Sequence, residues 1–270
     1  MIRPKQLLRL LPLVASAHAQ FISTMPDTVS PIDPAKARSF VTCPILRNTE
    51  RQCWIAKNDG VTYYIDPGTG YRPQLGFRVL VEGIVSSEPN ACGGVMLNPV
   101  HVTVLPDRVP ACNTILPAAG FQSPPIRNTF GYVKHADDPA LPKYAPGDVL
   151  PLPPPPYKSL HYTVYFPYNR AFLPEGTTEV IVEAAAAYIR ASKPSHVTVT
   201  GYAGDVLLQT KRTLPESGAI AEGRAHLVAS ALQELGVDPH LLTVNWKADP
   251  APGDGVNDPD HRKTVIDIVL

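Results

Sequence analysis

The sequence lacks a net charge of either sign, because lysine plus arginine and aspartate plus glutamate each total 24 of its 270 residues. No basic or acidic field therefore favours nucleic acid or a lipid surface as a partner. After the N-terminus there is also no apolar run long enough for a transmembrane helix. These absences leave the composition of a globular protein, with 44% hydrophobic residues.

Recognisable metal and catalytic spacings are missing as well. Neither C-x-x-C nor H-x-x-x-H occurs, so we expect no metal and no cofactor. Cys92, in "NACGGV", would need a neighbouring base to act as a nucleophile, and the histidines show no catalytic grouping. The sequence therefore predicts a protein that is not an enzyme.

Residues 1–19 have the order of a secretory signal. Basic residues come first, a short apolar core follows, and Ala17-His18-Ala19 precedes Gln20 as an A-x-A cleavage site. A frayed N-terminal helix is the alternative interpretation. No cysteine follows the cleavage site to carry a lipid anchor. We expect the mature chain outside the cytoplasm.

The four cysteines, Cys43, Cys53, Cys92 and Cys112, all lie in the first half of the chain. An even number in a secreted chain indicates two disulfides, for which three pairings are possible. We favour Cys53 with Cys92, which would tie two strand starts, and Cys43 with Cys112, which would close the ends of the domain.

Residues 20–119 are predicted to form a small all-β domain. Two short runs flank Asp59-Gly60, a hairpin turn signal, and "GFRVLVEGIVSS" and "VMLNPVHVTVL" alternate apolar and polar residues. Gly83 inside the first of these runs indicates a bulge. An OB-like barrel is the first interpretation and a small sandwich is the second.

Proline is abundant, at 31 residues, and much of it lies in residues 120–157. This segment has almost no periodicity and ends in consecutive prolines, which favours a stiff, extended spacer with polyproline II character. A proline motif recognised by a partner is the weaker alternative. The sequence therefore predicts two domains separated by a linker.

Residues 158–270 alternate strand and helix patterns in the order β-α-β-α-β-β, which predicts an α+β fold with helices packed on one sheet. "LHYTVYFP" and "HVTVTGY" have strand alternation, and "TTEVIVEAAAAYIRAS" has a helical apolar face. The second helix contains "AEGRAHLVASALQELGV". It could begin as early as Thr213, because "TLPE" has the spacing of a capping box.

Arg224 interrupts the apolar stripe of that second helix. Val228, Ala231 and Leu232 share its face. A charge in this place must reach solvent, pair with a carboxylate or bind an anionic ligand, because a buried unpaired charge would cost several kcal/mol. Asp205, just past the preceding strand, is the carboxylate expected nearest to it.

Four stretches together resemble the OmpA-like peptidoglycan-binding domain: "VYFPYNRAFLPEG", "VTVTGY", "AEGRAHLVASALQELGV" and "HRKTVIDIV". The resemblance covers roughly residues 158–270. In that family an Asp at the end of the second strand and an Arg in the second helix hold the diaminopimelate of a murein stem peptide. Arg224 matches the Arg, whereas Gly204 stands at the Asp position and Asp205 follows one residue later.

The resemblance implies Asp205, Arg224, Ser217 and Arg262 as ligand-binding residues. The chain departs from the family at three places: Ser217, Ile220 and Ala221 replace its usual Asn, Leu and Ser; His261 precedes Arg262 and Lys263 where the family has Asn; and the loop "VLLQTKR" is longer. A ligand-free Asp205–Arg224 salt bridge is the alternative to a ligand clamp.

Two functions follow from these observations. The first is a non-enzymatic protein of the Gram-negative periplasm or envelope, with outer-membrane association an option, that binds peptidoglycan through the C-terminal domain and presents the β domain to other envelope proteins. The second is a periplasmic protein interaction module whose OmpA-like domain no longer binds murein.

Overall fold

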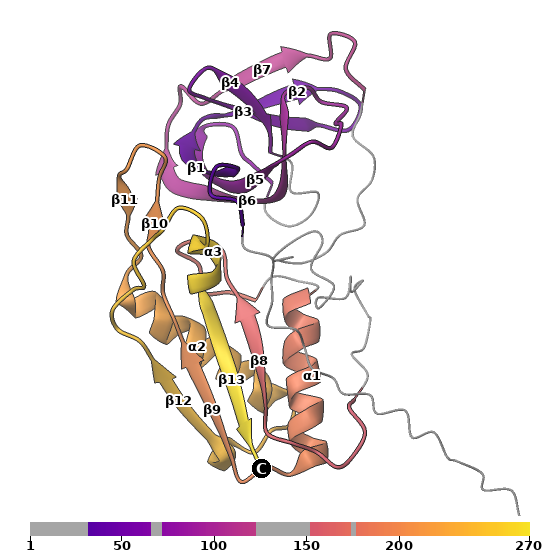
Figure 1. Cartoon of the computed structure of the whole chain (residues 1–270), viewed down its shortest axis with the longest axis vertical. Helices are drawn as coiled ribbons and strands as arrows, with labels where there is room; N and C mark the ends of the chain where they lie inside the picture. The colour runs from indigo at the N-terminus through magenta and orange to yellow at the C-terminus, as the bar shows by residue number, and fades with distance from the viewer. Residues whose placement is uncertain (1–31, 66–71, 123–151, 174–176) are drawn as a thin grey trace, which may run out of the picture.

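The computed structural model describes residues 32–65, 72–122, 152–173 and 177–270. The expected signal peptide, residues 1–19, and most of the expected linker lie outside the described residues. We call residues 32–65 and 72–122 the N-terminal unit and residues 152–173 and 177–270 the C-terminal unit. The whole is an α+β structure, as the sequence predicts (Figure 1).

The N-terminal unit is one curled sheet of seven strands in the order β1-β5-β6-β4-β3-β2-β7. Its β3–β4 hairpin turns at Asp59 and Gly60, which both have positive φ, so the expected turn is confirmed. The strands are β1 (Ala37–Thr42), β2 (Pro44–Asn48), β3 (Cys53–Asn58), β4 (Val61–Tyr64), β5 (Phe77–Ser86), β6 (Val95–Arg108) and β7 (Thr114–Pro117).

The chain itself joins the two sides of this sheet. Only Cys43 separates β1, which pairs with β5, from β2, which pairs with β3. Side chains from β1 to β6 therefore meet in a core that includes Phe40, Trp54 and Val79. A second, smaller cluster around the Cys53–Cys92 disulfide includes Ile55. The pairing of β5 with β6 shifts between Gly83 and Val85, which confirms the expected bulge.

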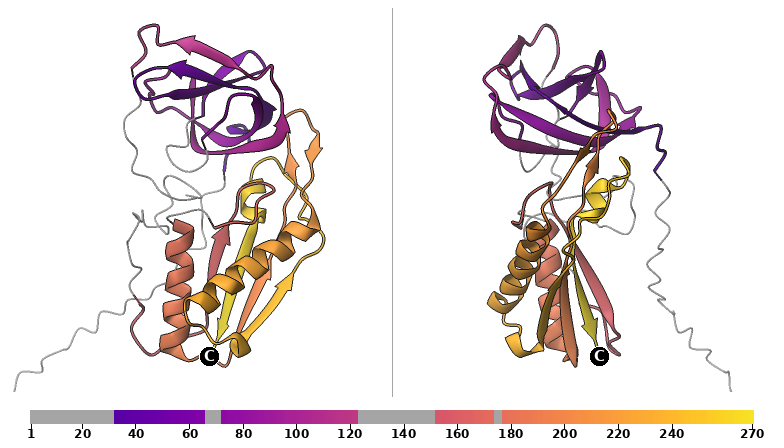
Figure 2. Two further views of the ribbon diagram at one scale, coloured as in Figure 1. Left: turned by 180° about the vertical axis from the view of Figure 1, so that it is seen from behind. Right: turned by 90° about the vertical axis from the view of Figure 1, so that its left-hand side faces the viewer.

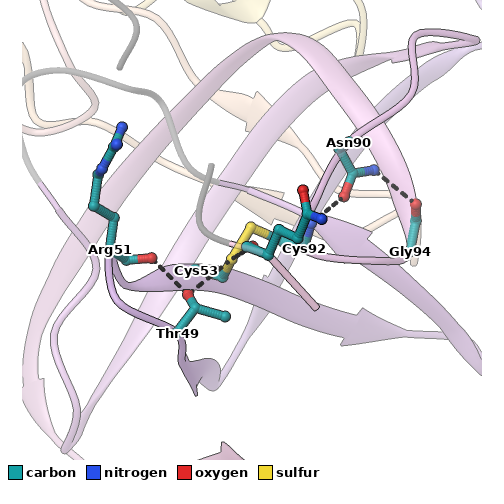
Figure 3. The surroundings of a disulfide bond; sticks show 7 residues. Thr49, Arg51, Cys53, Asn90, Cys92 and Gly94 are labelled. Carbon is teal, nitrogen blue, oxygen red and sulfur yellow. Dashed lines mark hydrogen bonds between the residues drawn. A yellow bond between two sulfur atoms is a disulfide. The ribbon is translucent and has the colours of Figure 1, made fainter. Parts of the chain in front are cut away.

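Two disulfides fasten this unit, Cys43–Cys112 and Cys53–Cys92, as favoured from the sequence. Figure 3 shows the second one, with the Thr49 hydroxyl 3.4 Å from the Cys53 sulfur. Nearby, the Asn90 side chain accepts from the Cys92 N–H and donates to the Gly94 carbonyl. The loop before β6 is thus held to the start of β3.

The C-terminal unit is a four-stranded sheet, in the order β12-β9-β13-β8, with its helices α1 and α2 on one face (Figure 2). The predicted β-α-β-α-β-β order is present, and a small hairpin and a short helix are added to it. The elements are β8 (Leu160–Tyr165), α1 (Thr177–Ser192), β9 (His196–Gly201), β10 (Val206–Leu207), β11 (Thr213–Leu214), α2 (Gly218–Glu234), η1 (Pro239–Leu241), β12 (Leu242–Trp246), α3 (Asp258–His261) and β13 (Lys263–Val269).

The core of this unit follows the strand and helix periodicities. Alternate strand residues, such as Val199 and Ile266, meet helix residues, such as Ile189 and Val228, and all four are fully or almost fully buried. Gly201 permits the close approach of α2, because a Cβ there would lie 2.0 Å from the Ala221 carbonyl oxygen.

The expected helix start at Thr213 is wrong. Thr213 belongs to β11, and α2 begins at Gly218 with Ser217 as its N-cap, whose hydroxyl accepts from the Ala219 N–H at 3.3 Å. The predicted capping box fails because the Glu216 carboxylate is engaged elsewhere, with Arg224.

The two units are packed against each other, whereas the sequence predicts a β domain projected on a spacer. The β10–β11 hairpin lies against β1 and β5, and the Gln209 N–H donates to the Ser39 carbonyl at 2.8 Å. Leu208 and Tyr168 from one unit are buried with Leu80 from the other. The loop "VLLQTKR" is therefore one part of the C-terminal unit that reaches the sheet of the N-terminal unit (Figure 1).

We expect Leu208→Ala to lower the free energy of unfolding by about 2–4 kcal/mol, since it removes a buried side chain from the contact between the units. Urea unfolding followed by circular dichroism measures this loss. Thr210→Ala, at an exposed position of the same hairpin, is the matched control. Equal stabilities for the two variants would show that the units do not depend on this contact.

Candidate functional site

Arg224 is fully buried, in spite of its charge, where α2 passes the ends of β8 and β9. Its guanidinium makes a two-bonded ion pair with the Glu216 carboxylate, with N···O distances of 2.8 and 2.7 Å. Both side chains have no exposed surface. Arg224 therefore pairs with a carboxylate of the chain and does not reach solvent.

Glu216 is the partner that sequence reasoning missed. It stands two helical turns before Arg224, in the loop between β11 and α2, where the spacing suggested a capping residue. Its carboxylate also accepts from the backbone N–H groups of Gly204, at 2.9 Å, and of Asn169. Four N–H donors, two from Arg224 of α2 and one from each of two separate backbone segments, thus surround one carboxylate, the arrangement that a buried charge requires.

Asp205 does not pair with Arg224, so the alternative of an Asp205–Arg224 salt bridge is wrong. The Asp205 carboxylate instead accepts from the Glu216 N–H at 3.0 Å. Asp205, which stands one residue after the Asp position of the family, therefore fixes the backbone at Glu216. At the preceding position, a Cβ on Gly204 would lie 2.4 Å from the Cβ of His261, so no aspartate fits there.

The remaining donors of Arg224 go to backbone carbonyls. Nε donates to Arg170 at 2.9 Å, one terminal nitrogen donates to Tyr202 at 2.8 Å, and the other donates to Pro167 at 3.1 Å. A guanidinium has five N–H groups, and all five are used within the chain. None remains for an outside carboxylate.

Arg262, the other basic candidate, is also fully buried, and its partner is in the N-terminal unit. Its terminal nitrogens donate to the two carboxylate oxygens of Glu82 at 3.1 and 2.7 Å. Glu82 is 5% exposed and lies on β5. The structure therefore brings Arg262 to the contact between the units, and Ser217 caps α2; the four candidates do not form one open site.

Burial shapes the titration of the acidic groups here. Burial raises the pKa of Glu82 above its ordinary 4.5, although the Arg262 charge and hydrogen bond lower it. Burial likewise raises the pKa of Asp258 above 3.8, although hydrogen bonds from the backbone N–H groups of Leu207, Gly255 and Asp254 lower it. Tyr168 is affected by both ion pairs, and burial together with Glu216 raises its pKa to about 12. These groups form a buried polar layer between the units.

Among the residues that the structure describes, no group of three His, Cys, Asp or Glu side chains could hold a metal ion. Within the same residues, no helix has both the length and the apolar character needed to cross a bilayer.

Solved structures of OmpA-like domains are similar to this chain. The OmpA-like domain of FopA1 from Francisella tularensis is 23% identical, with 40% of this chain and 71% of that chain covered and a TM-score of 0.34. The periplasmic domain of Helicobacter pylori MotB is 21% identical, with 42% and 77% covered and a TM-score of 0.32. The peptidoglycan-associated lipoprotein of Burkholderia pseudomallei is 18% identical, with 40% and 88% covered and a TM-score of 0.32.

No family model and no curated protein matches the chain. The likeness to the solved structures agrees with the resemblance seen in the sequence motifs. At these TM-scores it is too weak to transfer a ligand or a binding residue to this chain.

We expect Arg224→Ala to lower the free energy of unfolding by about 3–5 kcal/mol, because it leaves the Glu216 carboxylate buried without its counter-charge. Arg212→Ala, which removes an exposed arginine near the same loop, should change it by less than about 0.5 kcal/mol. Urea unfolding of both variants tests the difference. A fully stable Arg224→Ala would mean that the ion pair does not support the fold.

The raised pKa of Glu82 makes a pH-dependent prediction. The folded state holds this proton more tightly than the unfolded state, in which the pKa is near 4.5. The contribution of Glu82 to stability is therefore greatest at low pH and is lost as the pH rises through the folded pKa.

Relative to Glu82→Gln, which cannot titrate, the wild type should lose stability as the pH is raised from about 4.5 towards neutrality. Urea unfolding across this range measures the difference between the two curves. Glu50→Gln, at an exposed position, should give a curve parallel to the wild type. If the Glu82→Gln curve is also parallel, the pKa of Glu82 is not raised in the folded state.

Proposed function

We propose that this chain is a non-enzymatic envelope protein whose OmpA-like domain acts as a protein interaction module and does not clamp murein. The observation that carries the proposal is the complete use of the Arg224 guanidinium by Glu216 and three backbone carbonyls. A stem-peptide carboxylate has no free donor to bind on this side chain.

Displacement of Glu216 by a ligand would be costly. The Glu216 carboxylate would leave Arg224 and two backbone N–H groups, and an incoming carboxylate would have to satisfy all of them. A buried charge that loses its partner costs about 3–5 kcal/mol. A solvated ligand carboxylate gains little over a carboxylate that the chain already holds in place, since both make the same bonds.

The position of Arg262 also supports the proposal. This side chain, the second cation implied by the family resemblance, is paired with Glu82 of the N-terminal unit. The end of the C-terminal unit that bears α3 and the β10–β11 hairpin lies next to the N-terminal unit (Figures 1 and 2). This end of the C-terminal unit therefore serves to hold the N-terminal unit.

We place the protein in the periplasm of a Gram-negative bacterium. Two disulfides and no free cysteine fit an oxidising compartment. The signal-like order of residues 1–19 supports the same location.

For the N-terminal unit we infer an OB-like barrel. The support is its order of pairing, with β1 and β2 as one bent strand that pairs antiparallel with β5 at one end and with β3 at the other. Two parallel pairs, β2 with β7 and β4 with β6, complete the sheet. Such barrels present ligands or partners on their loops. We propose that this unit is the part shown to other envelope proteins.

The test uses a stem tripeptide ending in diaminopimelate, titrated into the mature chain by calorimetry, together with a pull-down on murein sacculi. We expect no saturable binding of the tripeptide to the wild type. In Glu216→Ala the guanidinium loses its carboxylate partner, so this variant should bind the tripeptide measurably. The double variant Glu216→Ala/Arg224→Ala should not bind the tripeptide. Circular dichroism confirms that each variant is folded.

Binding of the wild type to sacculi that Arg224→Lys abolishes would contradict the proposal, because lysine keeps the charge and loses only the planar fork. Binding to sacculi that is indifferent to Arg224 would mean that murein is held elsewhere on the chain, and the interaction-module proposal would then also fail.

A further inference from the structure

The strand β12 forms one edge of the C-terminal sheet. It pairs in parallel with β9, from Leu242 opposite Val197 to Trp246 opposite Gly201. On its other side no strand of the described ranges is hydrogen-bonded to it, and in both figures of the whole chain the described segments end there (Figures 1 and 2). A row of backbone N–H and C=O groups is therefore available to another strand.

This edge has none of the usual features that prevent pairing. Its sequence is Leu-Thr-Val-Asn-Trp, without a charge, a proline or a bulge. By contrast, β7 at an edge of the N-terminal sheet has only four residues and ends at Pro117. Proteins commonly protect long edges with charges or prolines, so an unprotected edge of β-branched and aromatic residues is suited to association.

A partly exposed apolar strip accompanies the edge. Leu242 and Val244 are half-buried against the helices, and so are Leu227 and Ala231 on α2. Trp246 is 40% exposed, and its ring lies 5.8 Å from the ring of His226 on α2. Partly exposed apolar residues of the strand and of the helix flank thus lie beside the backbone groups of the edge.

We propose that β12 pairs antiparallel with β12 of a second copy of this chain, about a two-fold axis at Val244. This register places Trp246 beside Leu242 of the other copy and Val244 beside its own equivalent on the helix side. On the open side it places Thr243 beside Asn245. No like charges meet, and every apolar residue faces an apolar residue, so the strand is complementary to itself.

The second copy is favoured over a strand of another protein by this self-complementarity. A two-fold pairing uses the same strip on both molecules, and the two α2 helices would run beside each other over the joined sheet. The pairing joins two C-terminal sheets into one and leaves each N-terminal unit free. It is independent of whether Arg224 binds a ligand.

Tryptophan fluorescence provides a direct readout. The chain has two tryptophans, and Trp54 is only 5% exposed within the N-terminal unit. Burial of Trp246 on association should therefore shift the emission to shorter wavelength as the protein concentration rises from about 1 to about 200 μM. Sedimentation equilibrium over the same range should show a dimer.

A charge exchange on the open side tests the register. Thr243 and Asn245 are both exposed, so lysines there should leave the monomer folded. Thr243→Lys/Asn245→Lys places two like-charged pairs across the axis and should weaken the dimer about tenfold or more. Thr243→Lys/Asn245→Glu places opposite charges in the same two pairs and should restore it.

A matched control is His161→Lys, which adds an exposed charge to β8 at the opposite edge of the same sheet and should leave the dimer unchanged. A monomer at every concentration would overturn the proposal. A dimer that ignores the two lysines, or that is lost equally with Thr243→Lys/Asn245→Glu, would overturn it as well, because the contact would then lie elsewhere or have another register.

Discussion

The buried guanidinium of Arg224 is the constraint on which the C-terminal unit depends. A guanidinium removed from water needs five acceptors, and a helix cannot supply them from its own backbone. Here they come from the segment after β8, from the end of β9 and from the loop before α2. One charge therefore determines how three loops converge at one end of the sheet.

That convergence also positions the contact between the units. Tyr168, in the first of these loops, donates to the Pro215 carbonyl at 2.7 Å and is buried together with Leu80 of the N-terminal unit. The Arg262–Glu82 pair lies in the same layer. Buried ion pairs add little net stability compared with apolar packing, but they tolerate few alternative arrangements, since each misplacement leaves a charge unpaired. We infer that the Arg262–Glu82 pair, which joins the units, specifies how they dock.

One end of the C-terminal unit and one edge of its sheet thus differ in which polar groups they leave unused. At the end with α3 and the hairpin, the charges face inward and are used within the chain. Along β12, backbone groups and half-buried apolar side chains remain on the surface. An interaction module needs a surface such as the β12 edge. A ligand clamp needs charged groups that the chain itself does not use, and the end with α3 and the hairpin does not offer them. This contrast is the physical basis for the function proposed above.

Local pattern was sufficient to predict much of the fold. Alternation along residues 160–166 and 196–201 marks strands because side chains of a strand point alternately to two faces. The Asp59-Gly60 turn follows from the positive φ that these two residues tolerate. At the bulge, Gly83 leaves room for the Pro99 carbonyl oxygen, which would lie 2.9 Å from a Cβ there. The favoured cysteine pairing was also correct. The unusual place of Arg224 on an apolar stripe was visible, since periodicity alone identifies it.

What periodicity could not predict was the choice of partners. Glu216 reads as a helix cap in the sequence, and only the folded loop brings it to Arg224 in place of Asp205. Glu82 lies 180 residues before Arg262, and no local signal connects them. The sequence by itself determined most of the helices and strands, the presence of two disulfides and the presence of a charge that had to be satisfied. Only the tertiary structure decided which carboxylate satisfies it, because that depends on which distant segments the sheet topology brings within hydrogen-bonding distance.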